Sequence, residues 1–212
     1  MEKIKWGIIG PGNIANNFAD GLKGSYSGQL VSIASKSEDR RKNFGDKYDI
    51  HPDFRFDSYE DIINSEHIDA IYISTPHTLH AQWTIKAAGK GKHILCEKPG
   101  AINFNEGKKI IDAVREAGVF YMEGFMYRCH PQIPKLIEII KNKIIGDVIS
   151  IETSFGFDMG KTIPDHRLFN KNLAGGGILD VGLYPISFSR LIAGVATGDK
   201  FSEPKFLDAE AK

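Results

Sequence analysis

The chain has 212 residues, 42% of them hydrophobic and 25% charged, which is typical of a globular protein long enough to bury a core. Its 27 basic residues balance 27 acidic ones, so we expect no nucleic-acid partner and no attraction to an anionic membrane. Two cysteines, no leader-like N-terminus and no apolar run approaching about 20 residues predict a reduced, cytoplasmic protein without a membrane span.

The first elements in the chain predict a dinucleotide-binding turn. Residues 4–9 predict a buried parallel strand, residues 14–22 predict a helix, and the turn between them reads G-x-G-x-x-A. The first glycine makes the tight turn, the second lets a pyrophosphate approach the backbone, and the helix N-terminus faces the phosphates. The order of strand, turn and helix favours this function over an ordinary glycine turn. The residues expected to contact the cofactor here are Gly10, Gly12, Asn13 and Ile14.

The end of the second predicted strand, residues 30–35, bears on the choice of cofactor. Rossmann sites that prefer NAD usually place an acidic residue at this strand end, and none stands at the tip here. Ser35, Lys36 and Arg40 could instead receive the 2′-phosphate of NADP, so we favour NADP and keep NAD possible. The alternative is that both cations are solvated and that an acid at the start of the next helix, residues 38–48, turns inward.

Strands and helices alternate up to residue 123, which predicts a doubly wound parallel α/β sheet. Three helices have a polar residue suited to capping directly before them: Ser37, Ser58 and Asn103. The further strands are predicted at residues 70–74, 93–96 and 120–123, and the further helices at residues 58–64, 79–88 and 103–117.

The strand at residues 93–96 leads directly into Glu97, Lys98 and Pro99. Ligands bind outside the carboxyl ends of strands in open α/β sheets, so these side chains are placed at the expected ligand site. A lysine held at that edge can take part in proton transfer. We therefore interpret Lys98 as the catalytic centre of a nicotinamide-dependent dehydrogenase.

The pattern changes after about residue 123. Two prolines introduce an amphipathic helix over residues 136–143. Apolar and polar residues then alternate over residues 148–157, which predicts an antiparallel strand with one covered face. A sheet of this type implies a second, α+β domain.

A buried helix is predicted over residues 178–192, after a glycine-rich loop. One strand and one helix cannot close a core, so we expect either a truncated fragment or a partner that supplies the missing sheet. We therefore divide the chain into an NAD(P)-binding Rossmann domain, residues 1–123, and a partial substrate and dimerisation domain, residues 124–212.

Four motifs carry a resemblance to a known family. They are GPGNIA at residues 10–15, the Thr75-Pro76 strand end with His80, GKHILCEKP at residues 91–99 and GGGILDVGLY at residues 175–184. Together they resemble the Gfo/Idh/MocA oxidoreductases, and the E-K-P and G-G-G-x-L-x-D-x-G pieces are highly specific. The segment EGFMYR at residues 123–128 further resembles the branch with dihydrodiol dehydrogenases, xylose dehydrogenases and glucose–fructose oxidoreductase.

The resemblance implies an N-terminal Rossmann domain followed by an open, mostly antiparallel α+β domain that holds a sugar-like substrate and usually forms the dimer interface. Members are typically much longer, so most of that second sheet would be absent here. The resemblance also implies that Lys98 is the catalytic lysine, Asp180 the motif aspartate and Tyr184 the general acid/base, where many members carry histidine. We place a further group of residues at the cofactor: Thr75, Pro76, His80, Glu97 and Lys98.

Asp180 and Tyr184 are four residues apart and would share one helix face. In the expected reaction Tyr184, assisted by Lys98, removes the hydroxyl proton while the carbinol hydride passes to the nicotinamide. We therefore predict an oxidoreductase that transfers a hydride between NADP and a secondary alcohol of a sugar or cyclic diol, and a homodimer where the second domain is complete. The alternative is a non-catalytic dinucleotide-binding module or an inactive fragment.

Some side chains leave more than one interpretation open. We expect no metal site, because His77 and His80 have the spacing of a ligand pair but lack a suitably placed third ligand. Arg128 and Arg167 could contact substrate or anchor loops. Four aromatic residues could line a sugar pocket, although core packing is the better single expectation: Phe125, Tyr127, Phe155 and Phe157.

Overall fold

The computed structural model describes residues 2–161 and 163–210. Contacts within the chain divide it into two compact units. The first unit comprises Met1–Gly124 and Asn170–Ala174, and the second comprises Phe125–Phe169 and Gly175–Lys212. The division at residue 123 assigned Asn170–Ala174 to the second domain, whereas these five residues pack with the first unit.

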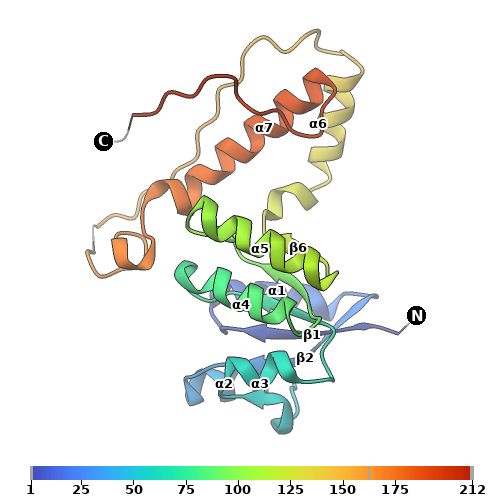
Figure 1. The fold of residues 1–212 in the computed structure, drawn as a ribbon, viewed down its shortest axis with the longest axis vertical. Helices are drawn as coiled ribbons and strands as arrows, with labels where there is room; N and C mark the ends of the chain where they lie inside the picture. The colour runs from blue at the N-terminus through green and yellow to red at the C-terminus, as the bar shows by residue number, and fades with distance from the viewer. Residues whose placement is uncertain (1, 162, 211–212) are drawn as a thin grey trace. The chain divides into compact units, whose positions relative to one another are not determined.

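The first unit is built on a six-stranded sheet with the order β3-β2-β1-β4-β5-β6, and every pairing is parallel (Figure 1). This is the strand order of a doubly wound dinucleotide-binding fold, with the topological switch point between β1 and β4. The predicted fold class is confirmed. The strands are β1 (Ile4–Ile9), β2 (Gly28–Ala34), β3 (Arg55–Phe56), β4 (Ala70–Ile73), β5 (His93–Cys96) and β6 (Tyr121–Glu123).

Helices follow the strands as the sequence predicts, and their caps are the predicted ones. The Ser37 hydroxyl accepts a hydrogen bond from the amide of Arg40, and the Asn103 side chain accepts one from the amide of Glu106. Each bond satisfies a backbone donor that the helix start leaves unpaired. The helices of the first unit are α1 (Asn13–Lys23), α2 (Glu38–Lys47), α3 (Tyr59–Asn64), α4 (His80–Ala88) and α5 (Phe104–Ala117), with 3-10 turns at Pro52–Phe54 and His77–Leu79.

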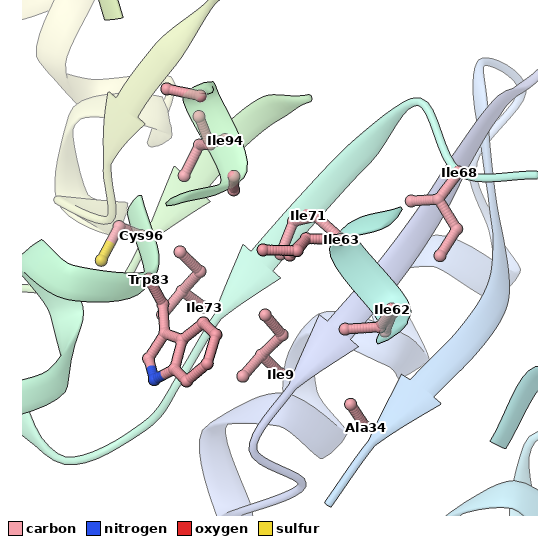
Figure 2. Close-up of a cluster of buried hydrophobic side chains, with 12 residues drawn as sticks. Ile9, Ala34, Ile62, Ile63, Ile68, Ile71, Ile73, Trp83, Ile94 and Cys96 are labelled. Carbon is pink, nitrogen blue, oxygen red and sulfur yellow. The ribbon is translucent and has the colours of Figure 1, made fainter. Parts of the chain in front are cut away.

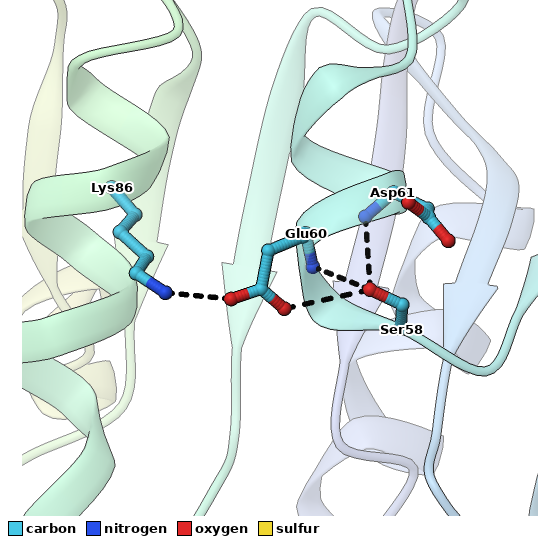
Figure 3. A network of polar contacts seen from close by, with 4 residues as sticks. All are labelled: Ser58, Glu60, Asp61 and Lys86. Atoms are coloured by element: carbon cyan, nitrogen blue, oxygen red, sulfur yellow. Dashed lines mark hydrogen bonds and ion pairs between the residues drawn. The ribbon is translucent and has the colours of Figure 1, made fainter.

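The start of α3 shows how a cap is combined with a tertiary contact (Figure 3). The Ser58 hydroxyl accepts hydrogen bonds from the amides of Glu60 and Asp61, at 3.1 and 3.3 Å. The carboxylate of Glu60 also forms an ion pair of 2.6 Å with Lys86 on α4. The same turn therefore starts one helix and joins it to the next.

Both faces of the sheet are covered by apolar side chains. Successive strand residues point to opposite faces, so Ile9 packs in one cluster and Ile8 in another. Figure 2 shows the first cluster, which includes Ile71 and Ile73 of β4 and Trp83 of α4. Residues of α1 and α2 complete the second cluster. A parallel sheet buried on both faces is the reason its strands are apolar without alternation.

Cys96 lies at the end of β5 within the first cluster and is fully buried. Burial raises the pKa of its thiol to about 12, so the thiol stays protonated at neutral pH. Cys96 is therefore a packing residue of the core.

The second unit is built on two main helices that share a third apolar cluster. The first helix begins before Pro134, earlier than predicted, because proline is tolerated in the first turn, where its missing N–H leaves no bond unmade. The elements of the second unit are α6 (Gln132–Lys141), α7 (Leu183–Thr197), a π-helical turn at Ile178–Gly182 and a 3-10 turn at Met126–Cys129. A further 3-10 turn, Lys171–Leu173, belongs to the first unit.

The strand predicted over residues 148–157 is wrong. This stretch forms neither helix nor strand. Val148 and Ile151 pack on the third cluster, while Ile149 is 92% exposed and Phe155 and Phe157 are more than half exposed. An extended segment becomes a strand only when a neighbour pairs with its backbone, and the described residues of this unit provide no such neighbour.

The helix predicted over residues 178–192 forms, but it is only partly buried. Ile178 and Ile186 are 66% and 56% exposed, while Leu191 and Ile192 are buried. Within the segment Lys171–Thr197 an 18-residue window has a mean hydropathy of 1.4, so by length and composition alone this segment could cross a membrane. A single segment of this kind is weak evidence, because core helices of soluble proteins meet the same criteria.

Candidate cofactor and catalytic site

The glycine turn lies at the switch point between β1 and β4. Gly10 has a positive φ of 91°, and a Cβ atom there would lie 3.0 Å from the carbonyl oxygen of Ser74. The Ser74 hydroxyl donates a hydrogen bond of 2.8 Å to the carbonyl of Gly10. Only glycine combines this backbone conformation with this close approach. The turn is thereby fixed against the end of β4.

Gly12 is the N-cap of α1, and no side chain caps the helix there. A Cβ atom built on Gly12 would meet no atom within 4 Å among the described residues. Ala15, one turn into the helix, is fully buried against the sheet. The start of α1 therefore offers backbone N–H groups toward open space, as a pyrophosphate requires.

The residues after β2 place three cationic side chains near the strand end, and two of them, Lys36 and Arg40, interact with Tyr59. Ser35 is buried, and its carbonyl accepts a hydrogen bond of 2.7 Å from the guanidinium of Arg41. The exposed Lys36 ammonium lies 5.8 Å from the centre of the Tyr59 ring. Burial raises the pKa of Tyr59, and the charge of Arg40 opposes that shift. Sequence reasoning missed Arg41 and Tyr59, which follow no motif and are brought here by the fold.

The segment after β4 carries the predicted residues Thr75, Pro76 and His80. The hydroxyl of Thr75 is buried and has no hydrogen-bond partner among the described residues. A buried polar atom without a partner is rare in a folded protein, and the Thr84 hydroxyl is a second case among the described residues. The role of Thr75 as a cofactor contact stays a prediction.

His80 is buried, and both its ring nitrogens lie 2.7 Å from backbone carbonyl oxygens, those of Pro99 and Thr75. Both ring nitrogens are thus engaged within the protein, and the placement of His80 at the cofactor stays a prediction. His77 lies nearby, with its Nδ1 atom 3.4 Å from the carbonyl of Ala174. Among the described residues, no group of three or more potential ligands could hold a metal ion.

Lys98 follows the end of β5 and is half-buried. Two carboxylates near this strand end, those of Glu97 and Glu123, are held by hydrogen bonds. The Glu97 carboxylate accepts a hydrogen bond of 2.5 Å from the Tyr72 hydroxyl. The Glu123 carboxylate, at the end of β6, accepts one of 2.7 Å from the amide of Gly100. Burial and the charge of Glu97 raise the pKa of Glu123, and the bond from Gly100 opposes this. Sequence reasoning missed Tyr72, since a strand-interior tyrosine carries no motif, and it named Glu123 only as the first residue of the EGFMYR segment without a role.

Glu123→Gln is expected to stabilise the chain at neutral pH. Because the pKa of Glu123 is raised above 4.5 in the folded state, the parent loses stability as the pH rises from the unfolded value through the folded one. Glutamine keeps an oxygen for the amide of Gly100 and carries no charge. We expect a gain in the free energy of unfolding on the order of 1 kcal/mol at about pH 7–8 and none at about pH 4, measured by urea unfolding.

The matched control for this prediction is Glu60→Gln. Glu60 is exposed, and its hydrogen bond with Lys86 lowers its pKa. Its contribution to stability is present above the unfolded pKa and is lost as the pH falls, so removing the charge should weaken the chain slightly at neutral pH. A Glu123→Gln chain that shows the same direction as the control would contradict the prediction.

The second unit holds Asp180 and Tyr184. Asp180 is buried, and its carboxylate lies 3.7 Å from the guanidinium of Arg167. The Tyr184 ring makes edge contacts with Phe125 and Phe155, with centroids 5.6 and 5.4 Å apart. Sequence reasoning left Arg167 open, and the structure pairs it with the motif aspartate.

Arg128 anchors structure in the second unit. Its guanidinium donates a hydrogen bond of 3.1 Å to the Ser187 hydroxyl and lies 4.6 Å from the centre of the Phe201 ring. The Tyr127 hydroxyl shares the same serine at 2.9 Å. These contacts favour the anchoring interpretation of Arg128 over substrate contact.

The residues predicted to be catalytic are distributed over both units. Lys98 belongs to the first unit, and Asp180 and Tyr184 belong to the second. Asp180 lies in the π-helical turn, whose hydrogen bonds span five residues, so the α-helical spacing assumed for this pair does not hold there. Turns of this kind are frequent at functional sites. The joint action of Lys98 and Tyr184 stays a prediction.

The parallel sheet and the glycine turn together define a dinucleotide-binding Rossmann domain. Comparison with known proteins agrees: residues 4–125, more than half of the chain, match the Gfo/Idh/MocA group, described as an oxidoreductase family with an NAD-binding Rossmann fold. The chain belongs to this family, as the motifs predict.

Individual relatives extend the likeness over nearly the whole chain. Mouse trans-1,2-dihydrobenzene-1,2-diol dehydrogenase is 34% identical over 94% of this chain and 59% of its own length. D-xylose 1-dehydrogenase (NADP(+)) 2 of Haloferax volcanii is 34% identical over 90% of this chain and 58% of its own. The crystal structure of aldose-aldose oxidoreductase from Caulobacter crescentus, complexed with glycerol, aligns with a TM-score of 0.82 at 28% identity, covering 93% of this chain and 58% of that one. The chain therefore spans about three fifths of the length of these relatives.

Proposed function

We propose that this chain carries the cofactor-binding and catalytic residues of an oxidoreductase that transfers a hydride between NADP and a secondary alcohol of a sugar or cyclic diol. The observation that carries the proposal is the position of Lys98 at the carboxyl end of β5, in a Rossmann sheet whose glycine turn can receive a dinucleotide. The names of the relatives, a diol dehydrogenase and a xylose dehydrogenase, support the same substrate class.

Each candidate residue has a distinct role in this proposal. A bound nicotinamide would accept or donate the hydride. In oxidation the phenolate of Tyr184 takes the proton from the substrate hydroxyl, and in reduction the Tyr184 hydroxyl returns that proton to the developing alkoxide. The ammonium of Lys98 stabilises the phenolate form of Tyr184, and Asp180, held by Arg167, orients the substrate hydroxyl.

Lys36→Ala tests the preference for NADP. Lys36 is exposed at the end of β2, where a 2′-phosphate would lie, so its removal should weaken NADPH binding by about tenfold, the loss expected for one charge-assisted hydrogen bond. NADH, which has no 2′-phosphate, should bind as it does to the parent. Fluorescence titration with both cofactors measures this.

Lys42→Ala is the control, because Lys42 is exposed farther along α2. We expect it to bind both cofactors as the parent does. An equal loss for NADPH and NADH in the Lys36→Ala chain would contradict the proposed 2′-phosphate contact.

A turnover screen tests the reaction itself. The chain and a form with a complete second domain are each assayed with NADP and NADPH against a panel of aldoses, cyclic diols and the corresponding carbonyl compounds. Turnover that needs NADP and a secondary alcohol or its ketone supports the proposal. Cofactor binding without turnover of any substrate would favour the second candidate, a non-catalytic dinucleotide-binding module. Sedimentation of the longer form tests the proposed homodimer.

A further inference from the structure

His80 lies at the first position of α4 and is 1% exposed. Its Nδ1 atom is 2.7 Å from the carbonyl oxygen of Pro99, and its Nε2 atom is 2.7 Å from the carbonyl oxygen of Thr75. Both partners are acceptors only. A neutral imidazole has one N–H and one lone pair, so it can donate to one of the two carbonyls and must turn its lone pair toward the other.

The two distances favour the doubly protonated ring. Hydrogen bonds between neutral N–H and oxygen cluster at about 2.9–3.0 Å, whereas charge-assisted bonds shorten to about 2.7–2.9 Å. Both contacts of His80 fall at the short end. An imidazolium satisfies both carbonyls, and a neutral ring leaves one contact repulsive.

The surroundings of His80 lower its pKa below the ordinary value of 6.5. Burial is the largest cause and the charge of Lys98 acts in the same sense, while the two carbonyls and the carboxylate of Glu97 offset only part of the shift. His77 lies next to it, with ring centroids 5.8 Å apart. The case for the charged ring therefore rests on its two short contacts with acceptors, which act against the effect of burial.

The two carbonyls belong to the segments that follow adjacent strands. The last paired residues of β4 and β5 are Ile73 and Cys96. The amide of Glu97, the next residue, still donates a hydrogen bond to the carbonyl of Ile73. Beyond that point the two chains leave the sheet, and the His80 ring spans them from Thr75 to Pro99. Pro99 directly follows Lys98, so the ring fixes the backbone on the far side of the lysine.

We propose that His80 is a positioning residue which, as a buried imidazolium, clamps the segment after β4 to the segment that carries Lys98. The clamp holds the Lys98 backbone in place at the edge of the sheet and keeps the Thr75 segment beside it. The importance of this for catalysis rests on the proposed function, whereas the clamp itself does not, so the two are tested separately.

The first test is the protonation state of the ring in the parent chain. Long-range ¹H–¹⁵N spectra of the labelled chain, with His80 assigned through contacts to protons of Thr75 and Pro99, report each ring nitrogen. We expect both nitrogens to carry a proton at pH 7. A ring with one unprotonated nitrogen at that pH would overturn the proposal, whether or not the chain turns over any substrate.

The second test is His80→Gln, which has one donor nitrogen in place of the two ring nitrogens that face the two carbonyls. Loss of one charge-assisted bond corresponds to at least about a tenfold change in a local opening equilibrium. Amide hydrogen exchange at Glu97, Lys98 and Gly100 should therefore quicken by at least about tenfold. The control, His67→Gln, replaces an exposed histidine of the same unit and should leave these rates unchanged.

Unchanged exchange at these amides in a folded His80→Gln chain would overturn the clamp. If that variant does not fold, the ¹⁵N spectrum of the parent still decides, because it needs no substitution. If the ring is doubly protonated and exchange quickens as expected, but the chain turns over no substrate, the clamp stands and only the proposed function is removed.

Discussion

A Lys98→Ala chain should lose turnover by about a thousandfold in the form that has a complete second domain. Positioned proton transfer contributes about 10²- to 10⁴-fold to a reaction rate, and the lysine at the end of β5 is the group proposed to make the Tyr184 hydroxyl usable. Steady-state kinetics with the substrate found in the screen measures the loss. Binding of NADPH, followed by fluorescence, should weaken far less than turnover, because the glycine turn and the end of β2 are untouched although Lys98 is itself expected near the cofactor.

The control for Lys98→Ala is Lys90→Ala, which removes an exposed lysine just after α4. We expect the control to keep the kcat and the KM of the parent. Turnover of the Lys98→Ala chain within a few-fold of the parent would remove Lys98 from the proposed mechanism.

The same kinetics can show whether Lys98 and Tyr184 act as one unit. Residues that work in a single step are strongly non-additive, so the double variant Lys98→Ala with Tyr184→Phe should be little slower than the slower single variant. Two independent contributions would multiply instead. This comparison tests the joint action of residues that come from the two units of the chain.

Local signals account for most of what sequence reasoning predicted correctly. Asn103 and Glu106 together cap the start of α5. The Asn103 side chain accepts a hydrogen bond from the amide of Glu106, and the Glu106 carboxylate accepts one from the amide of Ile102. Such contacts lie within one turn of the chain, so the residues alone specify them. The same is true of the apolar strands, whose continuous hydrophobic runs already imply burial on both faces.

The failures share one physical cause, which is dependence on distant parts of the chain. Residues 148–157 alternate as a strand should, but a strand needs a partner, and the described residues of its unit offer none. The roles of Tyr72 and Glu123 likewise arise only when β4, β5 and β6 lie side by side. The two carbonyl contacts of His80 likewise depend on residues 5 and 19 positions away, so its motif alone could not reveal them.

Gly10→Ala should lower both stability and cofactor affinity. The backbone of Gly10 has a φ of +91°, which costs a residue with a Cβ about 1–3 kcal/mol. The added Cβ would also lie 3.0 Å from the carbonyl oxygen of Ser74 and 3.2 Å from the amide nitrogen of Thr75. These are backbone atoms that cannot rotate away, so the glycine turn and the end of β4 must separate.

Gly91→Ala provides the control that separates backbone strain from this close approach. Gly91 also has a positive φ, +71°, but its added Cβ would meet no atom within 4 Å among the described residues. Urea unfolding should therefore show a loss of about 1–2 kcal/mol for Gly91→Ala and a larger one for Gly10→Ala. NADPH titration should show parent affinity for the control and a loss of at least about tenfold for Gly10→Ala, because only the latter moves the turn that faces the pyrophosphate. Parent affinity in a folded Gly10→Ala chain would mean that the dinucleotide does not bind at this turn, since no ligand could approach the displaced backbone unaffected.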